Sequence, residues 1–407
     1  MRSVKRIYDV PDWGLCTGCG ACAYFCNKGA VSLENIECVG IRPIFKRDIC
    51  AECDGCLEIC PGIRVELGNG CTNIPLKSDL LIGNSVDIWE GFAADSELRF
   101  QASSGGLLSA LSLYCLDKED IGFILHTGTD GAKPWVNKTV QSRSRSDLLG
   151  RCGSRYAPSS PCDSLRLIEE SDKPCVFIGK PCDVAAIAQL RKLRPRLDAN
   201  LALVMTFFCA GTPSTKGTLE LLDVLAIGPN AVEAIHYRGS GWPGDFRVEL
   251  KSNENIKSLS YESSWGFLQK YRCFRCHLCP DGMGELADLS CGDAWHRLGE
   301  EQEGISLVLV RTDRGQEILR RAMECGYLSL VRSSASDVIS AQGLAQRRRE
   351  IFGRLLAMKA LLIPTPRFHG FSLLEAWMGN TGSSKIHSIF GTFKRILLRG
   401  LWHRNPP

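Results

Sequence analysis

The chain has 407 residues, more than a single hydrophobic core usually organises, so two or three domains are expected. Hydrophobic residues make up 44% and charged residues 23% of the chain, which excludes a disordered or fibrous protein. The net charge of +4 is spread over 49 basic and 45 acidic side chains, so we expect no nucleic-acid partner.

Cysteine is the residue type that departs most from ordinary composition. The chain has 21, an odd count in a protein far larger than the small secreted scaffolds that disulfides hold together, which favours metal binding. The first residues, MRSVKRIYDVPDWGLC, lack the apolar segment of a secretory signal, and the longest apolar stretch, Leu201 to Ala210, is too short to span a membrane. We therefore expect a cytoplasmic protein.

Two cysteine runs near the N-terminus share the spacing C-x2-C-x2-C-x3-C. They are Cys16, Cys19, Cys22 and Cys26, and Cys50, Cys53, Cys56 and Cys60, the second followed by Pro61. This is the run of bacterial ferredoxins, in which three cysteines hold one [4Fe-4S] cluster and the fourth completes the other cluster. The expected ligand sets are therefore Cys16, Cys19, Cys22 and Cys60, and Cys50, Cys53, Cys56 and Cys26.

Structural zinc is the alternative for these two runs, but four closely spaced cysteines in each run favour clusters over separate C-x2-C pairs. Cys38 and Cys71 fall outside both runs and are expected to be buried thiols rather than ligands. Few uninterrupted apolar segments occur in this region. Residues 1–80 are therefore predicted to form a small ferredoxin-like 2x[4Fe-4S] domain whose core is inorganic rather than aliphatic.

From Ile88 onward, apolar runs of strand length alternate with helix-like stretches, which predicts an α/β fold. The predicted strands are 121–126, 175–179, 201–208, 246–250 and 305–311, and the predicted helices are 106–116, 183–193 and 312–325. The basic run 347–349 is expected on a solvated helix face.

A second cysteine group comprises Cys273, Cys276 and Cys279. This C-x2-C-x2-C spacing can cap one face of a cubane, so a fourth ligand must come from elsewhere. The candidates are Cys182, Cys209 and Cys291. The first two each follow an apolar strand, which places them where cofactors of open α/β sheets bind. His277 is expected to lie beside the thiols rather than to ligate a metal.

Four glycine or small-residue turns lie in the middle of the chain: SSGG at Ser103, GSRY at Gly153, GKPCD at Gly179 and CAGTPS at Cys209. None matches the nicotinamide or P-loop patterns, and each alone is explained by turn formation. Together they predict loops at the carboxyl ends of strands, where backbone amides, hydroxyls and the cations Arg155 and Lys180 can hold a pyrophosphate. A dinucleotide such as FAD would suit these loops.

The order of these motifs, followed by RCxxC, PD, AD and GDAW, resembles the coenzyme F420 hydrogenase/dehydrogenase beta subunit family over roughly Ile88 to Leu330. The resemblance implies an N-terminal family region at 88–168, a C-terminal region at 169–335, and an iron-sulfur flavoprotein with FAD next to a third [4Fe-4S] cluster. Cys273, Cys276 and Cys279 would belong to that cluster. We name Cys182 as its fourth ligand, although the sequence does not choose among Cys182, Cys209 and Cys291. The flavin would be lined by Ser104, Gly105, Gly106, Ser154, Arg155, Tyr156, Lys180, Pro181, Gly211 and Thr212.

The sequence departs from the family pattern at Cys152, where a small residue is expected, and in the tail after Leu330, which has no counterpart in the minimal pattern. Family members differ in their acceptor, so the resemblance implies an oxidoreductase acting on a deazaflavin coenzyme or another small organic acceptor. The electron donor would be a ferredoxin or another redox partner protein. The alternative is a non-catalytic electron-transfer subunit that docks on a separate enzyme.

A radical enzyme using S-adenosylmethionine is disfavoured because no C-x3-C-x2-C run occurs in the chain. Five side chains are candidate proton donors, although a strand-end or turn role is the simpler explanation for each: His126, His236, Asp281, Asp288 and Asp293.

The tail, residues 336–407, is expected to be helical. Between Lys385 and Arg404 it has five basic residues and no acidic one. Apolar residues spaced by three or four predict one helical face, composed of Ile386, Phe390, Phe393, Leu397 and Leu401. Packing of this face on the α/β domain or on a partner subunit is the favoured expectation, and peripheral contact with an anionic membrane is the alternative.

Overall fold

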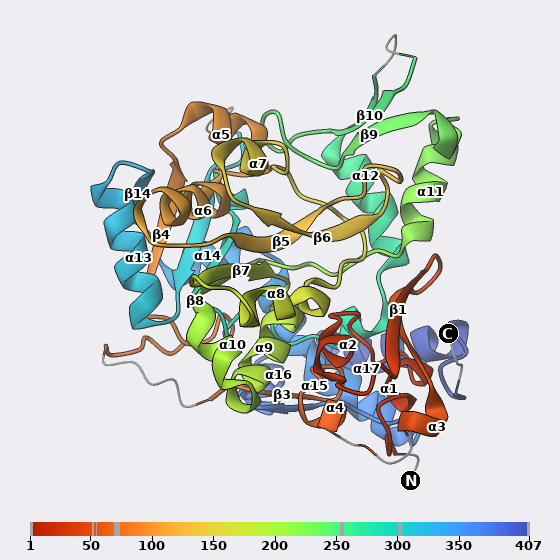
Figure 1. Ribbon diagram of the computed structural model, residues 1–407. Helices are drawn as coiled ribbons and strands as arrows, with labels where there is room; N and C mark the ends of the chain where they lie inside the picture. Colours follow the sequence, from red (N-terminus) through yellow and green to blue (C-terminus); the bar gives the residue numbers. More distant parts are fainter. Residues whose placement is uncertain are drawn as a thin grey trace.

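A computed structural model describes residues 3–50, 53, 55–68, 74–252, 256–299 and 303–404. Within these ranges, eight strands form the mixed sheet at the centre of the molecule (Figure 1). In their order across the sheet, the strands are β14 (Leu328–Arg332), β4 (Asp87–Ala93), β13 (Ser306–Val310), β12 (Leu289–Asp293), β8 (Leu201–Phe207), β7 (Cys175–Gly179), β5 (Ile124–Thr129) and β6 (Asn137–Ser142).

The middle of this sheet is parallel: β5, β7, β8 and β12 run in one direction, and the remaining pairs are antiparallel. Central strands such as β13 are buried along their whole length, which explains their continuous apolar sequences. The prediction of an α/β fold is confirmed, as are its three helices, α6 (Leu107–Lys118), α9 (Pro181–Leu193) and α13 (Asp313–Glu324).

Shorter elements surround the large sheet. The predicted strand at 246–250 is confirmed as β10 (Phe246–Leu250), the middle strand of a small antiparallel sheet with β9 (Val232–His236) and β11 (Lys257–Leu259). Helices α11 (Thr215–Val224) and α12 (Tyr261–Leu268) pack on this small sheet. The remaining helices of the central region are α5 (Ser96–Gln101), α7 (Arg145–Leu149), α8 (Arg166–Glu169) and α10 (Pro195–Asn200).

The N-terminal module, residues 3–68, consists of short elements: α1 (Asp9–Asp12), α2 (Ala21–Phe25), β1 (Val31–Ile36), β2 (Gly40–Phe45), α3 (Arg47–Cys50), α4 (Gly55–Glu58) and β3 (Arg64–Glu66). The expectation of a core without aliphatic residues is wrong. Val10, Trp13 and Leu15 are buried in one apolar cluster with Met358 and Ile396 of the tail. The module therefore takes part of its core from the other end of the chain.

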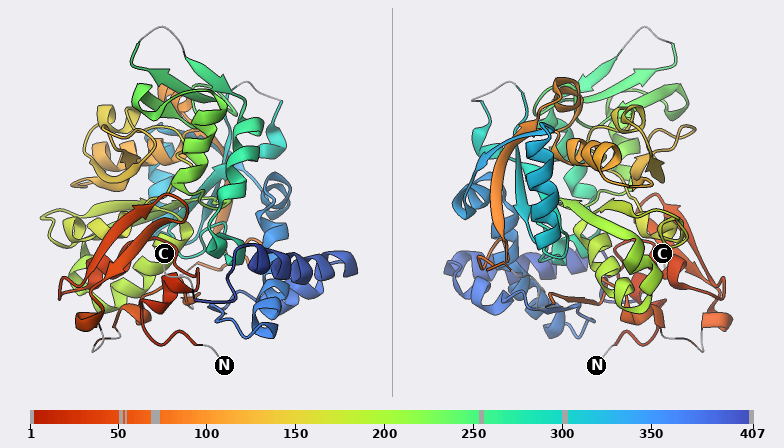
Figure 2. Two further views of the ribbon diagram at one scale, coloured as in Figure 1. Left: turned by 90° about the vertical axis from the view of Figure 1, so that its right-hand side faces the viewer. Right: turned by 60° about the vertical axis from the view of Figure 1, so that its left-hand side comes forward.

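The tail contains β15 (Arg367–His369) and four helices, α14 (Ala335–Ala341), α15 (Leu344–Ala360), α16 (Leu373–Met378) and α17 (Gly382–Leu398). Strand β15 pairs in parallel with β3, and Figure 2 shows the N-terminal module and the tail side by side at one end of the molecule. The two ends of the chain thus form one structural unit beside the large sheet.

The basic run 347–349 is not uniformly solvated as predicted. Arg348 is only 5% exposed and forms an ion pair with the equally buried Glu285, while it also donates to the carbonyl oxygen of Phe371. An arginine buried in this way fixes α15 to the central region. No helix within the described ranges is long and apolar enough to cross a membrane.

Candidate functional site

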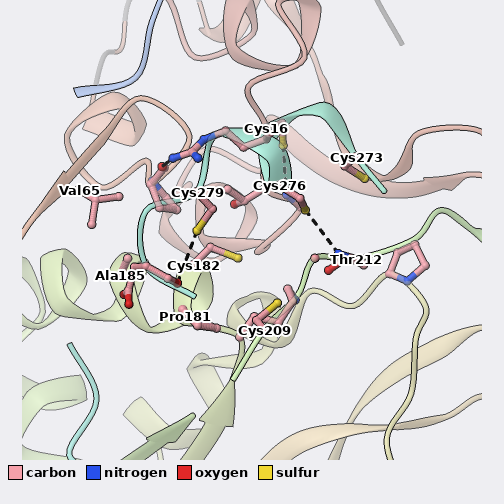
Figure 3. A pocket seen from close by; sticks show the side chains of 18 of the residues that line it. Cys16, Val65, Pro181, Cys182, Ala185, Cys209, Thr212, Cys273, Cys276 and Cys279 are labelled. Carbon is pink, nitrogen blue, oxygen red and sulfur yellow. Dashed lines mark hydrogen bonds between the residues drawn. The ribbon is translucent and has the colours of Figure 1, made fainter. Parts of the chain in front are cut away.

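Six thiols from four separate segments line one pocket, which we call the thiol pocket: Cys16, Cys182, Cys209, Cys273, Cys276 and Cys279. Cys182 is the second residue of α9 and Cys209 follows β8; Cys273 and Cys279 flank the short turn η4 (Phe274–Leu278), which contains Cys276. Figure 3 shows these sulfur atoms gathered around the pocket. The pocket therefore joins the central region to the first cysteine run.

Two of these thiols meet because β7 and β8 are adjacent parallel strands. Their carboxyl ends lie at the same edge of the sheet, so the loops that carry Cys182 and Cys209 emerge side by side. The amide of Thr212, three residues after Cys209, donates to the sulfur of Cys276 at 3.4 Å. This bond links the loop after β8 to the segment that contains η4.

Burial is the main cause of the raised thiol pKa values in the pocket. It raises the pKa of Cys276 to about 12, with further contributions from Cys273 and Cys209, and that of Cys279 to about 11. Burial and then Asp183 raise the pKa of Cys182, and Cys209 and Cys279 raise it further. Cys182 therefore lies near Cys209 and Cys279, and Cys276 lies near Cys273, Cys209 and Cys279. Cys291, the third candidate ligand, lies outside the pocket, and burial alone raises its pKa to about 12.

Cys273 occupies a different side of the site. Its thiol donates to the carbonyl oxygen of Val39 at 3.2 Å, and Figure 3 shows it on the side of Cys276 away from Cys182 and Cys279. The buried Arg42 lies beside Cys273, Cys276 and Cys16; burial opposes its charge, but Cys16 and Cys273 outweigh burial and raise the pKa of Arg42. Sequence reasoning missed Arg42, since an arginine in a hairpin strand matches no motif.

The two N-terminal runs are brought together in the combination that their spacing predicts. Burial raises the pKa of Cys22, and the neighbouring charges that raise it further belong mainly to Cys19, Cys16 and Cys60. Burial likewise raises the pKa of Cys56 to about 12, with contributions from Cys26, Cys53 and Cys50. Cys60 thus lies beside the first run and Cys26 beside the second.

The cysteines within the described ranges form no disulfides. The expectation that Cys38 is a buried thiol is wrong, because its side chain is exposed next to the turn between β1 and β2. Cys71 lies outside the described residues. His277 is half-buried among arginines: burial and then Arg395 and Arg272 lower its pKa to about 2, so its ring is neutral.

A second cavity, of about 310 Å³, lies between the large sheet and α12. Its volume falls within the range of small-molecule sites, about 300–1,000 Å³. The four predicted turns all contribute to its lining. Of the predicted flavin residues, those on its wall are Ser104, Gly106, Ser154, Arg155, Tyr156, Lys180, Gly211 and Thr212.

The other two predicted flavin residues lie elsewhere. Gly105 is buried behind the wall, where its amide donates to Ser306 Oγ at 2.9 Å. A Cβ atom at this position would stand 2.5 Å from the carbonyl oxygen of Gly91, so only glycine lets the turn approach β4. Pro181 lines the thiol pocket instead.

The thiol pocket and the cavity share a wall composed of Ser159, Lys180, Cys209, Gly211 and Thr212. The buried Lys180 is central to this wall: its ammonium group lies 2.8 Å from Asp183 and 2.8 Å from the carbonyl oxygen of Ser159. Burial favours the neutral amine, but Asp183 outweighs it and raises the pKa of Lys180. A fixed positive charge therefore stands between the thiols and the cavity.

Arg155 is placed differently from the role predicted for it. All three nitrogens of its guanidinium donate to protein acceptors: the side chain of Asn137 and the carbonyl oxygens of Pro134 and Ile235. Because its guanidinium nitrogens already donate to the protein, Arg155 stabilises the wall of the cavity more directly than it could bind a phosphate.

The opposite wall contains a buried ion pair that sequence reasoning missed. Arg238 and Asp293 are joined by two bonds of 2.7 and 3.0 Å, and Trp242 Nε1 donates to the same carboxylate. The guanidinium lies 4.8 Å from the ring centroid of Tyr261 and 4.9 Å from that of Trp295. Planar groups and a paired charge therefore face the cavity. A lone arginine after a strand gives no sequence signal of this role.

The candidate proton donors are dispersed. His126 and Asp293 line the cavity, and burial followed by Arg151 lowers the pKa of His126 to about 4. Asp281 lines the thiol pocket, where burial and Glu285 raise its pKa to about 6. Asp288 accepts from the amide of Val204 and the hydroxyl of Thr312, and His236 pairs with Glu249 on the small sheet.

Comparison with known proteins places this site in a family. Residues 88–166 match the family model described as coenzyme F420 hydrogenase/dehydrogenase, beta subunit N-term, and residues 172–335 match the companion model for the C terminus of the same beta subunit. The chain is 26% identical over 272 residues to coenzyme F420 hydrogenase subunit beta of Methanococcus voltae, a match that covers 65% of this chain and 90% of the relative.

A longer match is to the coenzyme F420-dependent sulfite reductase of Methanocaldococcus jannaschii, 24% identical over 321 residues and covering 77% of this chain but 47% of the relative. A chain in the solved F420-reducing [NiFe] hydrogenase complex from Methanosarcina barkeri shares the fold, with a TM-score of 0.55 and 22% identity; it aligns over 70% of this chain and 96% of its own length. The two family models together match more than half of the sequence, so the chain belongs to the coenzyme F420 hydrogenase/dehydrogenase beta subunit family.

Proposed function

We propose that the protein is an iron-sulfur flavoprotein oxidoreductase that carries electrons from a redox partner through [4Fe-4S] clusters and FAD to a two-electron acceptor. The observation that carries the proposal is the wall shared by the thiol pocket and the cavity, formed around Lys180 and Cys209. This wall would set a cluster site directly against a site for a flavin. The names of the relatives, a hydrogenase subunit and a sulfite reductase that are both linked to coenzyme F420, support the same class of reaction.

The ligands proposed for the N-terminal clusters are those of the two ferredoxin-like runs. For the third cluster we propose Cys182, Cys209, Cys276 and Cys279, which all line the thiol pocket. This set keeps the predicted Cys182 but replaces Cys273, whose thiol faces Val39 and Cys16. Cys273 and Arg42 would then lie between the third cluster and the cluster at Cys16.

The spacing of the thiols favours clusters over zinc. Thiolates around one zinc ion stand within about 4 Å of one another, because each Zn–S bond is only about 2.3 Å long. Within the described ranges, no three histidine, cysteine or carboxylate side chains are grouped as one metal ion requires. A cubane takes its four protein ligands on four separate irons, so it accepts more widely spaced thiols.

The cavity suits a flavin dinucleotide in its chemistry. Small-residue turns line it at Ser104 and Gly106, at Gly153 and Ser154, and at Gly211, where backbone amides can contact phosphate oxygens closely. A bound flavin accepts electrons singly and delivers them in pairs as hydride, which would join one-electron clusters to a two-electron acceptor. The protein's own part would be to position the ring and exclude water.

The acceptor proposed is a deazaflavin coenzyme or another small organic molecule, and the donor a ferredoxin or another redox partner protein. The planar side chains Tyr261 and Trp295, with Arg238 against their faces, would form the wall on which a flat acceptor stacks. A cytoplasmic location belongs to this proposal as well.

The test is the cofactor content of protein purified without oxygen. We expect about twelve iron atoms, equal acid-labile sulfide and one FAD per chain. Stoichiometric zinc without sulfide would contradict the cluster assignment. Flavin absorbance and turnover of an artificial acceptor by the isolated chain would distinguish an enzyme from a non-catalytic electron-transfer subunit, which would hold clusters but reduce no small acceptor.

A further inference from the structure

Helix α17 presents its apolar residues to solvent. Ile386 is 60% exposed, Phe390 64% and Leu398 76%, and Leu397 and the nearby Trp402 are also exposed. The amphipathic helix predicted at 385–404 is present, but Ile386, Phe390 and Leu397 of its predicted apolar face do not pack on the α/β domain; packing on a partner subunit, the other part of the expectation, stays a prediction. We call the residues Ile386, Phe390, Leu397 and Leu398 the outward face.

The opposite side of α17 explains this orientation. Its buried residues are Ser388, Thr392 and Ile396, and the side chain of Ser388 lies so close to Gly353 of α15 that a Cβ atom there would overlap it. Small side chains let the two helices approach closely, and the hydroxyls of Ser388 and Thr392 bond to their own helix. The close packing leaves the larger apolar residues outside.

The rotation of α17 is also fixed at its C-terminal end. Leu401 packs against the apolar cluster of the N-terminal module, and Arg404 forms an ion pair with Asp9 of that module. The helix therefore rests on α15 and on the N-terminal module at once. The exposed apolar surface belongs to a rigid, well-anchored helix, which favours an interaction site over a loosely attached end.

Positive charge predominates along the same segment. The formally charged residues of 382–404 are all basic, namely Lys385, Lys394, Arg395, Arg399 and Arg404; Lys394 is exposed, Arg395 and Arg399 are half-buried, and Arg404 is paired with Asp9. A second copy of the same helix would bring like charges together, so pairing between two copies is disfavoured. The occupant that suits this surface has apolar side chains surrounded by acidic ones.

The basic edge also reaches the proposed clusters. Arg399 donates to the carbonyl oxygen of Arg272 at 3.0 Å and lies close enough to Cys273 and Cys276 to interact with their charges. Arg347, from α15, donates to the carbonyl oxygen of Ala210 at 2.8 Å, beside Cys209. A protein bound on α17 would thus approach the third cluster site from the solvent side.

We propose that the outward face of α17 and its basic edge form the docking surface for an acidic one-electron carrier protein. This inference rests on the proposed electron relay and adds the surface at which electrons enter the protein. The family models end at residue 335, so α17 lies outside the matched region, while relatives such as the Methanococcus voltae protein are named as subunits of larger enzymes. An anionic membrane is the competing occupant of this surface, and the experiment below distinguishes a membrane from a carrier protein.

The experiment compares full-length, cluster-loaded proteins. In one double variant, Phe390→Glu with Leu398→Glu, two residues of the outward face become anionic. In the matched control, Val224→Glu with Val331→Glu, valines that are 62% and 61% exposed on α11 and β14 receive the same change. The probe is a reduced, acidic bacterial two-cluster ferredoxin, and the measurement is its second-order rate of oxidation by each protein at low and high salt.

We expect the outward-face variant to lower this rate by about tenfold at low salt, with a smaller difference at high salt, because docking is steered by opposite charges. The control should stay within about twofold of the natural chain, as surface substitutions usually do. Dithionite, which needs no protein docking, should reduce all three proteins alike. Equal ferredoxin rates in the two double variants would overturn the docking surface.

The same proteins distinguish failure of the proposed docking surface from failure of the proposed function. Failure of dithionite to reduce the natural chain would contradict the proposed electron relay itself. The natural chain is also sedimented with phosphatidylglycerol vesicles. If it binds the vesicles, the outward-face variant does not, and the ferredoxin rates stay equal, then the outward face binds a membrane and the proposed carrier protein is contradicted.

Discussion

The N-terminal module and the thiol pocket both gather cysteines, but they do so over very different distances in the sequence. In the module, each expected group of four comes from two runs that begin at Cys16 and Cys50, and the groups are predicted from the spacing alone. In the pocket, the close thiols come from α9, from the loop after β8 and from the segment around η4. The large sheet, rather than a local motif, brings them together.

This difference concerns two thiols of the pocket in particular, Cys273 and Cys209. Cys273 belongs by spacing to the same run as Cys276 and Cys279, yet its thiol faces Val39 and the first N-terminal run. Cys209 has no cysteine within its own turn, yet it lines both the thiol pocket and the cavity. Proximity in sequence agrees with the ligands proposed for the module and differs from those proposed for the pocket.

The largest expected effect comes from removing a ligand of the module. Cys56→Ala should lower the iron content from about twelve to about eight atoms per chain and reduce thermal stability, because metal binding contributes to the folding free energy. The module should nevertheless remain attached, since its apolar cluster includes residues of α15 and α17. Iron analysis and limited proteolysis measure both effects. Release of the whole module would show that the shared core is too weak to hold it.

Two variants of the thiol pocket test whether sequence spacing or proximity in the folded structure better predicts the ligands of the third cluster. Cys209→Ala should lose about four iron atoms, whereas Cys273→Ala should retain all three clusters with altered spectra at most. Electron paramagnetic resonance of the reduced proteins, together with iron analysis, distinguishes the two. If Cys273→Ala loses a cluster and Cys209→Ala does not, the sequence spacing is the better guide in the pocket too.

A smaller effect is expected on the wall of the cavity. Arg155→Ala leaves the side chain of Asn137 and the carbonyl oxygens of Pro134 and Ile235 without their donor, so the free energy of unfolding should fall by about 1–3 kcal/mol. The affinity for FAD should change little in comparison. Chemical denaturation and flavin titration measure the two quantities. Loss of flavin at unchanged stability would instead assign Arg155 to the phosphates.

The smallest effect serves as a control for all cysteine variants. Cys38→Ser removes an exposed thiol outside both ligand sets, so iron content should be unchanged and stability should shift by less than about 0.5 kcal/mol. The same denaturation and iron assays apply. A loss of iron here would mean that cysteine substitution perturbs the clusters indirectly.

Much of the architecture could be predicted from the sequence. The predicted strands and helices of the central region are present because buried strands require continuous apolar runs, and because Thr312 caps the start of α13 through a bond to the amide of Gly315. The motif order also predicted the family correctly. Of the four predicted strand-end turns, GKPCD and CAGTPS do follow the parallel strands β7 and β8, where loops emerge at one edge of the sheet, whereas SSGG lies between α5 and α6 and GSRY follows α7; all four nevertheless line one cavity.

What the sequence by itself determined is the chemistry available along the chain: eight regularly spaced cysteines, a third group, and glycine turns after apolar strands. Only the tertiary structure decided which distant groups meet. Arg238 with Asp293, Arg42 with Cys273, and the outward rotation of α17 depend on contacts between segments far apart in the sequence. Periodicity shows that a helix has an apolar face, but packing against α15 determines whether that face is buried.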